Sequence, residues 1–304
     1  MKKRILIITA VVLSALLAGC IRVTISNGDK TETSSQTGAV TEESTSIASE
    51  GGMDFNYILI AESGSMAGRT VYYAEKTGTG VHLESYFETS FWDSKKEESV
   101  DVKRIIHERD GDDALYREIA MMAEEQDLKS WDGFSESDPD VMDGYGFSLE
   151  AELADGTAIS AYGSNAYPDG YHGFASLLEQ LCCTELIEST EFVMPQFTLT
   201  LPEHWVGNIT VYYYDGFVRF DAVNVDTAGI MALYMDPYEE DEEGYIQLGS
   251  YEDKDFDETI YVSVKVLDEA HSPKKYESMT DAQKAVCDSI DEDSLKIADS
   301  VKFR

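Results

Sequence analysis

An acidic loop in the middle of the chain carries residues of the types that bind cations. Asp138 and Asp140 are two residues apart, as carboxylate ligands are in calcium-binding loops, and Asp143 follows them. The third ligand position of an EF-hand loop falls on Met142, and the position of its closing glutamate falls on Leu149. The EF-hand pattern is therefore not met. Asp138, Asp140 and Asp143 remain candidates for a looser calcium site, which makes a calcium-binding surface protein one alternative function.

The residue types of common catalytic sites are present without the required spacing. None of the histidines has the H-E-x-x-H spacing of a zinc protease; they are His82, His107, His172, His204 and His271. The run GSMAG at residues 64–68 lacks the central serine of the nucleophile elbow G-x-S-x-G. We therefore assign no catalytic residue, no cofactor and no firm metal site, and we expect a protein that is not an enzyme. An extracytoplasmic hydrolase with an unfamiliar site stays open as an alternative.

Three cysteines lie in the second half of the chain, at Cys182, Cys183 and Cys287. Without a C-x-x-C spacing they predict neither a zinc knuckle nor a thioredoxin-type redox pair. A disulfide between Cys287 and one of the adjacent pair, and buried free thiols, are both open.

The first residues have the layout of a secretory signal. Lys2, Lys3 and Arg4 precede an apolar run at residues 5–17. The run is shorter than the roughly 20 apolar residues that span a bilayer, as expected for a signal peptide. It ends in Leu-Ala-Gly followed by Cys20.

This LAGC sequence resembles the lipobox of bacterial lipoproteins. The resemblance implies that a diglyceride is attached to the thiol of Cys20 and that the signal peptide, residues 1–19, is removed. Two acyl chains make a durable membrane anchor. The chain is accordingly expected on the extracytoplasmic face of the cell membrane, held there by lipid.

Residues 20–52 read as a tether. From residue 26 onward the segment is rich in Ser, Thr, Gly and Glu and has no aromatic residue, so it buries too little apolar surface to offset its ordering entropy. A flexible coil of this length spans about 30 Å.

Composition bounds the partners and the number of domains. The full chain has a formal net charge of −36; residues 1–19 hold three basic and no acidic residues, so the remainder carries −39. Such a chain is repelled by nucleic acid, and the expected partner is an unknown protein or a cell-wall component. Hydrophobic residues make up 43% of the chain, enough for real cores. The length after the tether suggests two small α+β domains, each an antiparallel sheet with packed helices.

The first domain is expected at residues 53–190. Three β-rich runs, at residues 55–61, 70–75 and 81–87, predict a meander. Residues 112–127 predict a helix with Leu115, Ile119, Met122 and Gln126 on one face. Alternating residues on both sides of Asp155-Gly156 predict a two-residue hairpin at 147–162, and residues 173–186 predict a second helix.

A segment of this domain resembles one in uncharacterised Firmicutes lipoproteins. The shared features are WDGF at residues 131–134, a D-G turn at 143–144, the hairpin, and GSNAYP at 163–168. The resemblance covers about 60 residues and implies no known activity.

The second domain is expected at residues 192–304. Strands are predicted at 193–201, 209–214, 217–222, 230–235 and 260–266, with Asp215-Gly216 as a turn. Thr280 and Gln283 form a capping box, which predicts a helix that starts there. FTLTLPEHW at residues 197–205 is similar to the opening of a lipoprotein domain of PsbP-like type. The resemblance implies a curved antiparallel sheet with helices and a binding or assembly role.

Three consecutive tyrosines, at residues 212–214, must place rings on both faces of their strand. One face belongs to the core, and the other is either a binding platform or covered by a helix. Together these features favour a membrane-anchored binding or interaction module with an unknown ligand.

Overall fold

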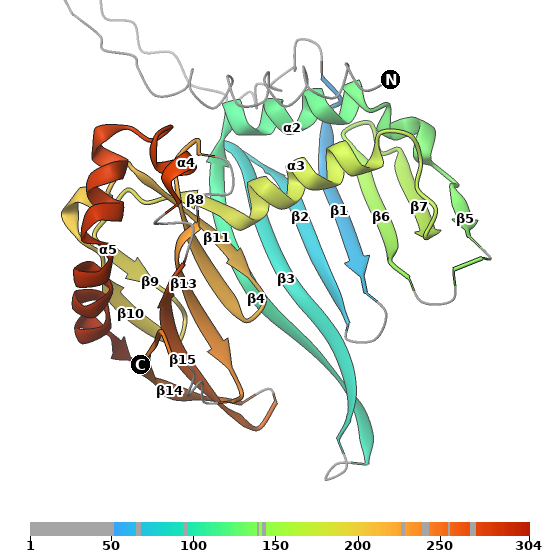
Figure 1. Cartoon of the computed structure of the whole chain (residues 1–304). Coiled ribbons are helices and arrows are strands. Elements are labelled where there is room, and N and C mark those ends of the chain that lie inside the picture. Colours follow the sequence, from blue (N-terminus) through green and yellow to red (C-terminus); the bar gives the residue numbers. More distant parts are fainter. Residues whose placement is uncertain are drawn as a thin grey trace, which may run out of the picture. The chain divides into compact units, whose positions relative to one another are not determined.

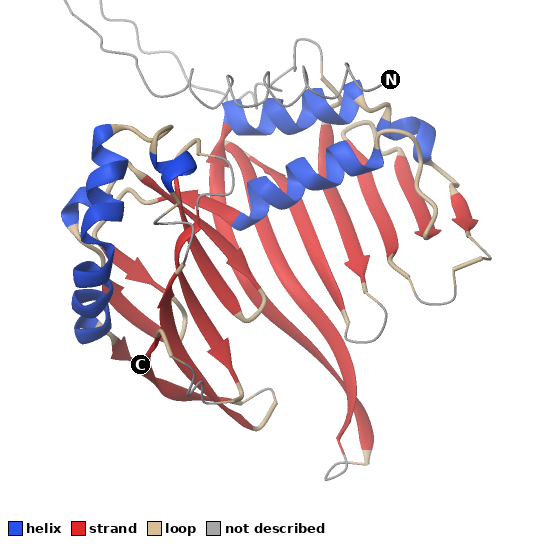
Figure 2. Ribbon diagram, in the orientation of Figure 1, coloured by secondary structure: helices blue, strands red, loops and turns tan. Residues whose placement is uncertain are grey.

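The computed structural model describes residues 52–64, 68–93, 97–138, 140–141, 144–225, 229–238, 243–254, 256–267 and 272–304. The predicted signal peptide, Cys20 and the predicted tether up to residue 51 lie outside the described residues, as do Asp143 and His271. All described residues belong to one unit, Ala48–Arg304. Several antiparallel sheets with a few helices confirm the predicted α+β class (Figure 2).

A seven-stranded sheet has the strand order β4-β3-β2-β1-β6-β7-β5 (Figure 1). Its strands are β1 (Phe55–Ser63), β2 (Arg69–Thr77), β3 (Gly80–Asp93), β4 (Glu98–Asp112), β5 (Ser135–Ser137), β6 (Gly146–Leu153) and β7 (Ala158–Ser164). Neighbouring strands are antiparallel except β5 and β7, which run parallel. The predicted meander and the predicted hairpin strands are confirmed. Strand β4 was not predicted, because most of its side chains are charged and leave no apolar alternation to detect.

The turn between β6 and β7 has three residues instead of the predicted two. The N–H of Leu153 donates to the carbonyl of Thr157 at 2.9 Å, and the N–H of Gly156 donates to the carbonyl of Leu153 at 2.9 Å. Gly156 has φ of 84°. This is a three-residue hairpin loop closed by a left-handed glycine, a form that Asp-Gly suits as well as it suits the two-residue turn.

Helices α2 (Asp113–Glu125) and α3 (Tyr171–Cys183) cover one face of this sheet (Figures 1 and 2). The side chain of Asp112 caps α2 by accepting from the N–H groups of Ala114 and Leu115. A short 3-10 helix, η1 (Leu128–Trp131), follows α2.

The predicted apolar face of α2 is rotated in the structure. The fully buried residues are Tyr116, Ile119, Ala120 and Ala123, whereas Leu115, Met122 and Gln126 are only half-buried. The alanines let the helix approach the sheet closely, and the Tyr116 hydroxyl finds polar partners at Asp54 and the backbone of Phe55.

The second predicted helix ends earlier than expected. Residues 184–186 were predicted as helix but form β8 (Thr184–Leu186), which pairs with β11 (Ile209–Tyr214). Pairing with a neighbouring strand here overrides the local helical pattern. The helix itself is confirmed, and its buried residues include Phe174, Leu178 and Cys182.

The second half of the chain forms a six-stranded sheet in the order β14-β15-β13-β12-β11-β8 and a three-stranded sheet in the order β16-β10-β9. The remaining elements are β9 (Glu191–Val193), β10 (Phe197–Thr200), η2 (Glu203–Trp205), β12 (Phe217–Ala222), β13 (Gly229–Asp236), β14 (Tyr245–Asp253), β15 (Glu258–Val266), α4 (Pro273–Tyr276), α5 (Asp281–Ser300) and β16 (Lys302–Phe303). The predicted hairpin at Asp215-Gly216, the buried strand β13 and the capping box of α5 are confirmed. Strand β14 was not predicted.

The single strand predicted at residues 193–201 is wrong. Strand β9 ends at Val193, the N–H of Met194 donates to the carbonyl of Phe197 across a turn, and β10 begins at Phe197. Pro195 lies in this turn and has no N–H for a strand ladder, which explains the break.

Strands of the seven-stranded sheet all lie within residues 55–164, and those of the other two sheets all lie within residues 184–303. The boundary between two domains at about residue 190 stays a prediction. Among the described helices, none has both the length and the apolar character needed to cross a membrane.

Candidate functional site

In the described part of the chain, no helix packs on the second face of the seven-stranded sheet, which we call the open face (Figures 1 and 2). Contacts with the six-stranded sheet also lie on the helix side: Arg104, opposite Phe87 in the ladder, reaches Asp215 and Asp253. The open face is thus the face of this sheet that carries no described helix.

The strand register brings side chains from six strands into one row across the open face, and all but Ser148 are apolar or aromatic. Directly opposite residues share a face, and the paired positions run in the order Tyr162, Ser148, Ala61, Val71, Tyr86 and Ile105. We call this row the apolar band. In the middle of the band Ala61, Val71 and Tyr86 are buried, at 2%, 0% and 7% exposure, and Leu59 and Tyr73 pack against them. At the two ends, Tyr162 is 54% exposed and Ile105 is 39% exposed.

Carboxylates line one side of the apolar band. The next two rows of paired positions contain six of them: Glu75, Glu84, Glu108, Asp110, Glu150 and Glu152. No lysine or arginine occupies these two rows among the described pairs; His82 is the one basic side chain, and it lies 2.9 Å from Asp110. We call these two rows the acidic side.

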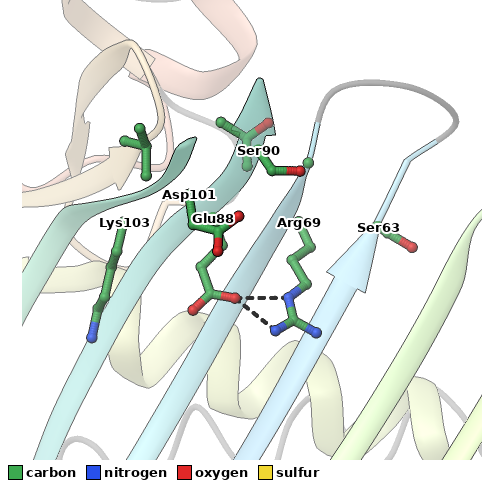
Figure 3. Close-up of a pocket in the computed structure, with 9 residues that line it drawn as sticks. Ser63, Arg69, Glu88, Ser90, Asp101 and Lys103 are labelled. Carbon is green, nitrogen blue, oxygen red and sulfur yellow. Dashed lines mark hydrogen bonds and ion pairs between the residues drawn. The ribbon is translucent and has the colours of Figure 1, made fainter. Parts of the chain in front are cut away.

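The opposite side of the band holds a polar depression of about 460 Å³ (Figure 3). Its labelled lining residues are Ser63, Arg69, Glu88, Ser90, Asp101 and Lys103. Arg69 donates from Nε and Nη2 to the same oxygen of Glu88, at 2.8 and 2.7 Å. Arginine's planar fork is suited to such a two-pronged contact, which holds both side chains in place at the rim of the depression.

Lys103 crosses the apolar band. Its ammonium lies 3.7 Å from the centroid of the Tyr86 ring and 2.7 Å from Oε1 of Glu84 on the acidic side. Glu84 is only 15% exposed, so this ion pair is less screened than an ordinary surface pair. The face thus accommodates an ammonium between a tyrosine ring and a carboxylate.

Burial and negative charge raise the pKa values of two tyrosines on the open face. Burial, followed by the charge and hydrogen bond of Glu75, raises the pKa of Tyr73 to about 12. Burial and the carboxylates of Glu88 and Glu84 likewise raise the pKa of Tyr86. These phenols stay neutral at physiological pH, and the surrounding potential is negative. The surface is suited to binding cations, whereas proton transfer by these tyrosines at neutral pH is disfavoured.

The predicted calcium ligands do not converge. Asp138 accepts a hydrogen bond at 3.0 Å from the N–H of Asp140, which makes the pair a local turn, and both residues are exposed. Asp143 lies outside the described residues. Within the described ranges, no group of three or more His, Cys, Asp or Glu side chains is placed to hold a metal ion.

The described histidines differ in their environments. His172 is exposed and His82 is half-buried beside Asp110, whereas His107 stacks on Tyr213 with ring centroids 4.0 Å apart. His107 comes from a charged edge strand, and its burial results from packing by the six-stranded sheet that local sequence does not reveal.

His204, Ser289 and Asp293 have the residue types of a hydrolytic triad but a different geometry. The same imidazole nitrogen, Nε2, lies 3.0 Å from the Ser289 oxygen and 2.9 Å from Asp293. Ser289 itself donates to Asp293 at 2.7 Å. In a triad the carboxylate and the hydroxyl contact opposite nitrogens of the histidine, so that the ring relays the proton. Here the Ser289 hydroxyl and the same His204 nitrogen both contact Asp293, so the relay geometry of a triad is not formed. The cluster instead joins η2 to α5.

The consecutive tyrosines divide between the two faces as predicted. Tyr213 enters the core, and Arg219 lies over Tyr212 and Tyr214 on the other face, 5.0 and 5.8 Å from their centroids. Tyr214 stacks on Phe217 with centroids 4.4 Å apart and planes 12° apart. Neighbouring groups occupy these ring faces, which leaves less ring surface for stacking a sugar than a flat platform offers.

Comparisons of the chain with protein-family models, with curated proteins and with solved structures find no match. The resemblances to bacterial lipoproteins, to uncharacterised Firmicutes lipoproteins and to PsbP-like domains accordingly stay predictions from short motifs.

Sequence reasoning missed the residues of the open face. One signal was available: β1 has apolar residues at Leu59 and Ala61 as well as at Ile58 and Ile60, so both of its faces are apolar. That pattern indicates a central strand with something packed on its second side. Which residues of other strands join it depends on strand order, which the sequence alone does not provide.

Proposed function

We propose that this chain is a lipoprotein anchored through Cys20 to the extracytoplasmic face of the membrane, where it acts as a binding module that uses the open face. The anchor rests on the basic head, the apolar run and the LAGC sequence at residues 17–20. The binding role rests chiefly on one observation, the exposed ends, Tyr162 and Ile105, of the apolar band on the sheet face that carries no described helix.

The position of the chain's entry supports this use of the open face. The first described residues lie on the helix side, where the N–H of Met53 donates to the carbonyl of Ala120 in α2 at 2.9 Å. The described chain therefore enters the sheet from the face that α2 covers.

Site-specific photo-crosslinking in cells of the native host tests the binding role. A benzophenone amino acid replaces Tyr162 on the open face in one strain and Leu295 on α5 in another; both side chains are more than half exposed. Crosslinked adducts are expected from position 162 and not from position 295. Equal yields from the two positions, or none from position 162, would contradict the proposal.

A further inference from the structure

Strand β3 extends beyond its neighbour on one side. Its ladder with β2 ends at the pair of Arg69 with Glu88, whereas its ladder with β4 continues for five more pairs, the last of which joins Asp93 to Glu98. Past Glu88, β3 and β4 thus continue as a two-stranded ribbon (Figure 1). We call the side of residues 89–93 that faces away from β4 the β3 edge.

No other described strand pairs with the β3 edge, and no described backbone group outside the ribbon bonds to it. An edge of this kind presents a row of unpaired N–H and C=O groups, to which an extended chain can add. Phe256, in the turn between β14 and β15, stacks on Phe91 with ring centroids 5.6 Å apart and supports the ribbon from one face. That contact is made by side chains, so it leaves the backbone groups of the edge available.

The polar depression lies at the point where β2 ends and the β3 edge begins. Its lining includes Gly68 and Arg69 from the β2 side and Thr89 and Ser90 from the edge. A strand that extended the line of β2 along the β3 edge would enter this depression, which has a volume of about 460 Å³. The described part of the chain thus combines backbone groups that lack a partner with open space beside them.

Two carboxylates of the depression can accept further hydrogen bonds. Both nitrogens of Arg69 contact Oε2 of Glu88, so Oε1 of Glu88 is left for another donor. Asp101 is exposed, and its side chain has no ion pair or hydrogen bond with a described residue. Ser90 is opposite Asp101 in the ladder and two residues from Glu88, and its side chain is small. A lysine or arginine beside Ser90 in an added strand is therefore within reach of both carboxylates.

The opposite face of the ribbon supplies apolar neighbours. Phe91 pairs with Val100 and Thr89 pairs with Val102. Phe91, Val100 and Thr89 are half-buried. Side chains alternate along a strand, so an added strand with a basic residue beside Ser90 places the flanking residues beside Thr89 and Phe91. Apolar residues fit these two positions, and the preferred sequence therefore alternates basic and apolar residues.

We infer that the β3 edge binds, by strand addition, an extended segment of a partner protein in which basic and apolar residues alternate. Main-chain hydrogen bonds hold the segment, and its basic side chains meet Glu88 and Asp101. This surface goes beyond the proposed function, because it uses neither the lipid anchor nor the exposed ends of the apolar band.

Peptide binding to the full-length chain in detergent tests this inference. The probe is a fluorescent eight-residue peptide in which lysine and valine alternate, and its control has four lysines followed by four valines. Fluorescence anisotropy at about 0.15 M salt gives the dissociation constants. Hydrogen–deuterium exchange of the wild type locates the bound peptide. Asp101→Lys reverses one charge of the depression, and Asp291→Lys makes the same change at an exposed position of α5.

The alternating peptide is expected to bind at least about fivefold more tightly than the control. Asp101→Lys should weaken its binding about fivefold or more, whereas Asp291→Lys should change it less than about twofold. In the wild type, the bound peptide should slow amide exchange in residues 89–93 and leave exchange in β7 unchanged. Thermal melting of each variant verifies that the fold is retained.

Equal binding of the two peptides would overturn the inference, because charge alone would then explain the affinity. So would equal effects of the two substitutions, or no binding of the alternating peptide to the wild type. Unchanged exchange in residues 89–93 with the peptide bound would also overturn it, and that measurement needs no variant. Crosslinking from position 162 is independent of these results and judges the proposed function separately.

Discussion

The imidazole ring of His107 lies parallel to the phenol ring of Tyr213, with centroids 4.0 Å apart and planes within 4°. This contact joins β4 of the seven-stranded sheet to β11 of the six-stranded sheet. His107 Nε2 is buried without a hydrogen-bond partner among the described residues, and the nearest carboxylate oxygen, of Glu185, is 3.9 Å away. The ring is thus held in its neutral form between the two sheets.

Stability should fall in mildly acidic solution because of His107. Burial, followed by the positive charge of Arg109, lowers the pKa of His107 from 6.5 to about 4. Below about pH 6.5 the unfolded chain therefore binds a proton at this histidine, whereas the folded chain binds it only below about pH 4. The contribution of His107 to the free energy of unfolding is fully retained above pH 6.5. About 3 kcal/mol of it is lost as the pH falls to 4.

Urea unfolding of the wild type and of His107→Gln between pH 7.5 and 4.5 measures this effect. The wild type should lose more stability than the variant over that range, by on the order of 2–3 kcal/mol. The two curves running parallel would show that His107 titrates normally in the folded protein.

Asp293 should be a strong determinant of stability in the second half of the chain. It is 1% exposed, accepts from Trp205 Nε1 at 3.3 Å and from Ser289 at 2.7 Å, and pairs with His204. Asp293→Ala leaves the buried indole N–H without its acceptor and should cost about 2–4 kcal/mol. Asp291→Ala, an exposed position on the same helix, should change stability by less than about 0.5 kcal/mol.

Urea unfolding of both variants at pH 7.5 makes the comparison. A small effect of Asp293→Ala, similar to that of Asp291→Ala, would mean that the cluster between η2 and α5 is not held as described.

Substitution by alanine should have opposite effects on stability at Gly163 and at Gly173. A Cβ at Gly163 would lie 2.0 Å from the carbonyl oxygen of Ala166 and 2.5 Å from the Phe147 ring, so Gly163→Ala should destabilise by about 1–3 kcal/mol. Gly173, in the first turn of α3, has no heavy atom within 4 Å of its added Cβ. Gly173→Ala should stabilise by about 0.5 kcal/mol. Thermal melting in parallel tests the pair, and a shift of the same sign in both would refute the packing described at Gly163.

The three buried cysteines should be unreactive in the folded protein. All three are free thiols. Burial is the main cause that raises the pKa of Cys183 to about 11 and raises the pKa of Cys182 and Cys287 as well. At pH 8 about one Cys183 in a thousand is then a thiolate, the reactive form.

Mass spectrometry after treatment with iodoacetamide checks the cysteines. Folded Cys20→Ala should stay unmodified, and the same variant unfolded without a reductant should gain three labels. A single label after unfolding would reveal a disulfide among Cys182, Cys183 and Cys287.

Local patterns in the sequence predicted the elements that local chemistry determines. The capping box at Thr280, the hairpin strands and the second helix, α3, follow from short-range rules. The end of α3 was misjudged because residues 184–186 pair with β11, a contact made by distant residues. Strand β4 was missed because its charged side chains give no apolar period.

The short GSNAYP motif at residues 163–168 has a structural explanation. Asn165 adopts a left-handed conformation with φ of 52°, and its side-chain oxygen accepts from the N–H of Tyr145 at 2.9 Å. Its amide fills the space beside Gly144, where a Cβ would lie 1.9 Å away. Gly144 and Asn165 therefore depend on each other, although 21 residues separate them in sequence.

The candidate site could not be predicted, for a reason of geometry. Tyr162, Ala61, Val71, Tyr86 and Ile105 come from five different strands and meet only because the order β4-β3-β2-β1-β6-β7 sets them side by side. Each residue alone looks like an ordinary member of a strand. A shift of one residue in any pairing would move its side chain to the helix side.

The lipid anchor at Cys20 is the claim on which the proposed location and partners depend. Its most direct test is the intact mass and membrane partition of the protein expressed with its native N-terminus, beside Cys20→Ala. We expect the wild type in the membrane fraction, starting at a Cys20 that carries a diacylglyceryl group, and the variant without lipid. Release of both proteins without lipid, or retention of residues 1–19 in both, would contradict the anchor.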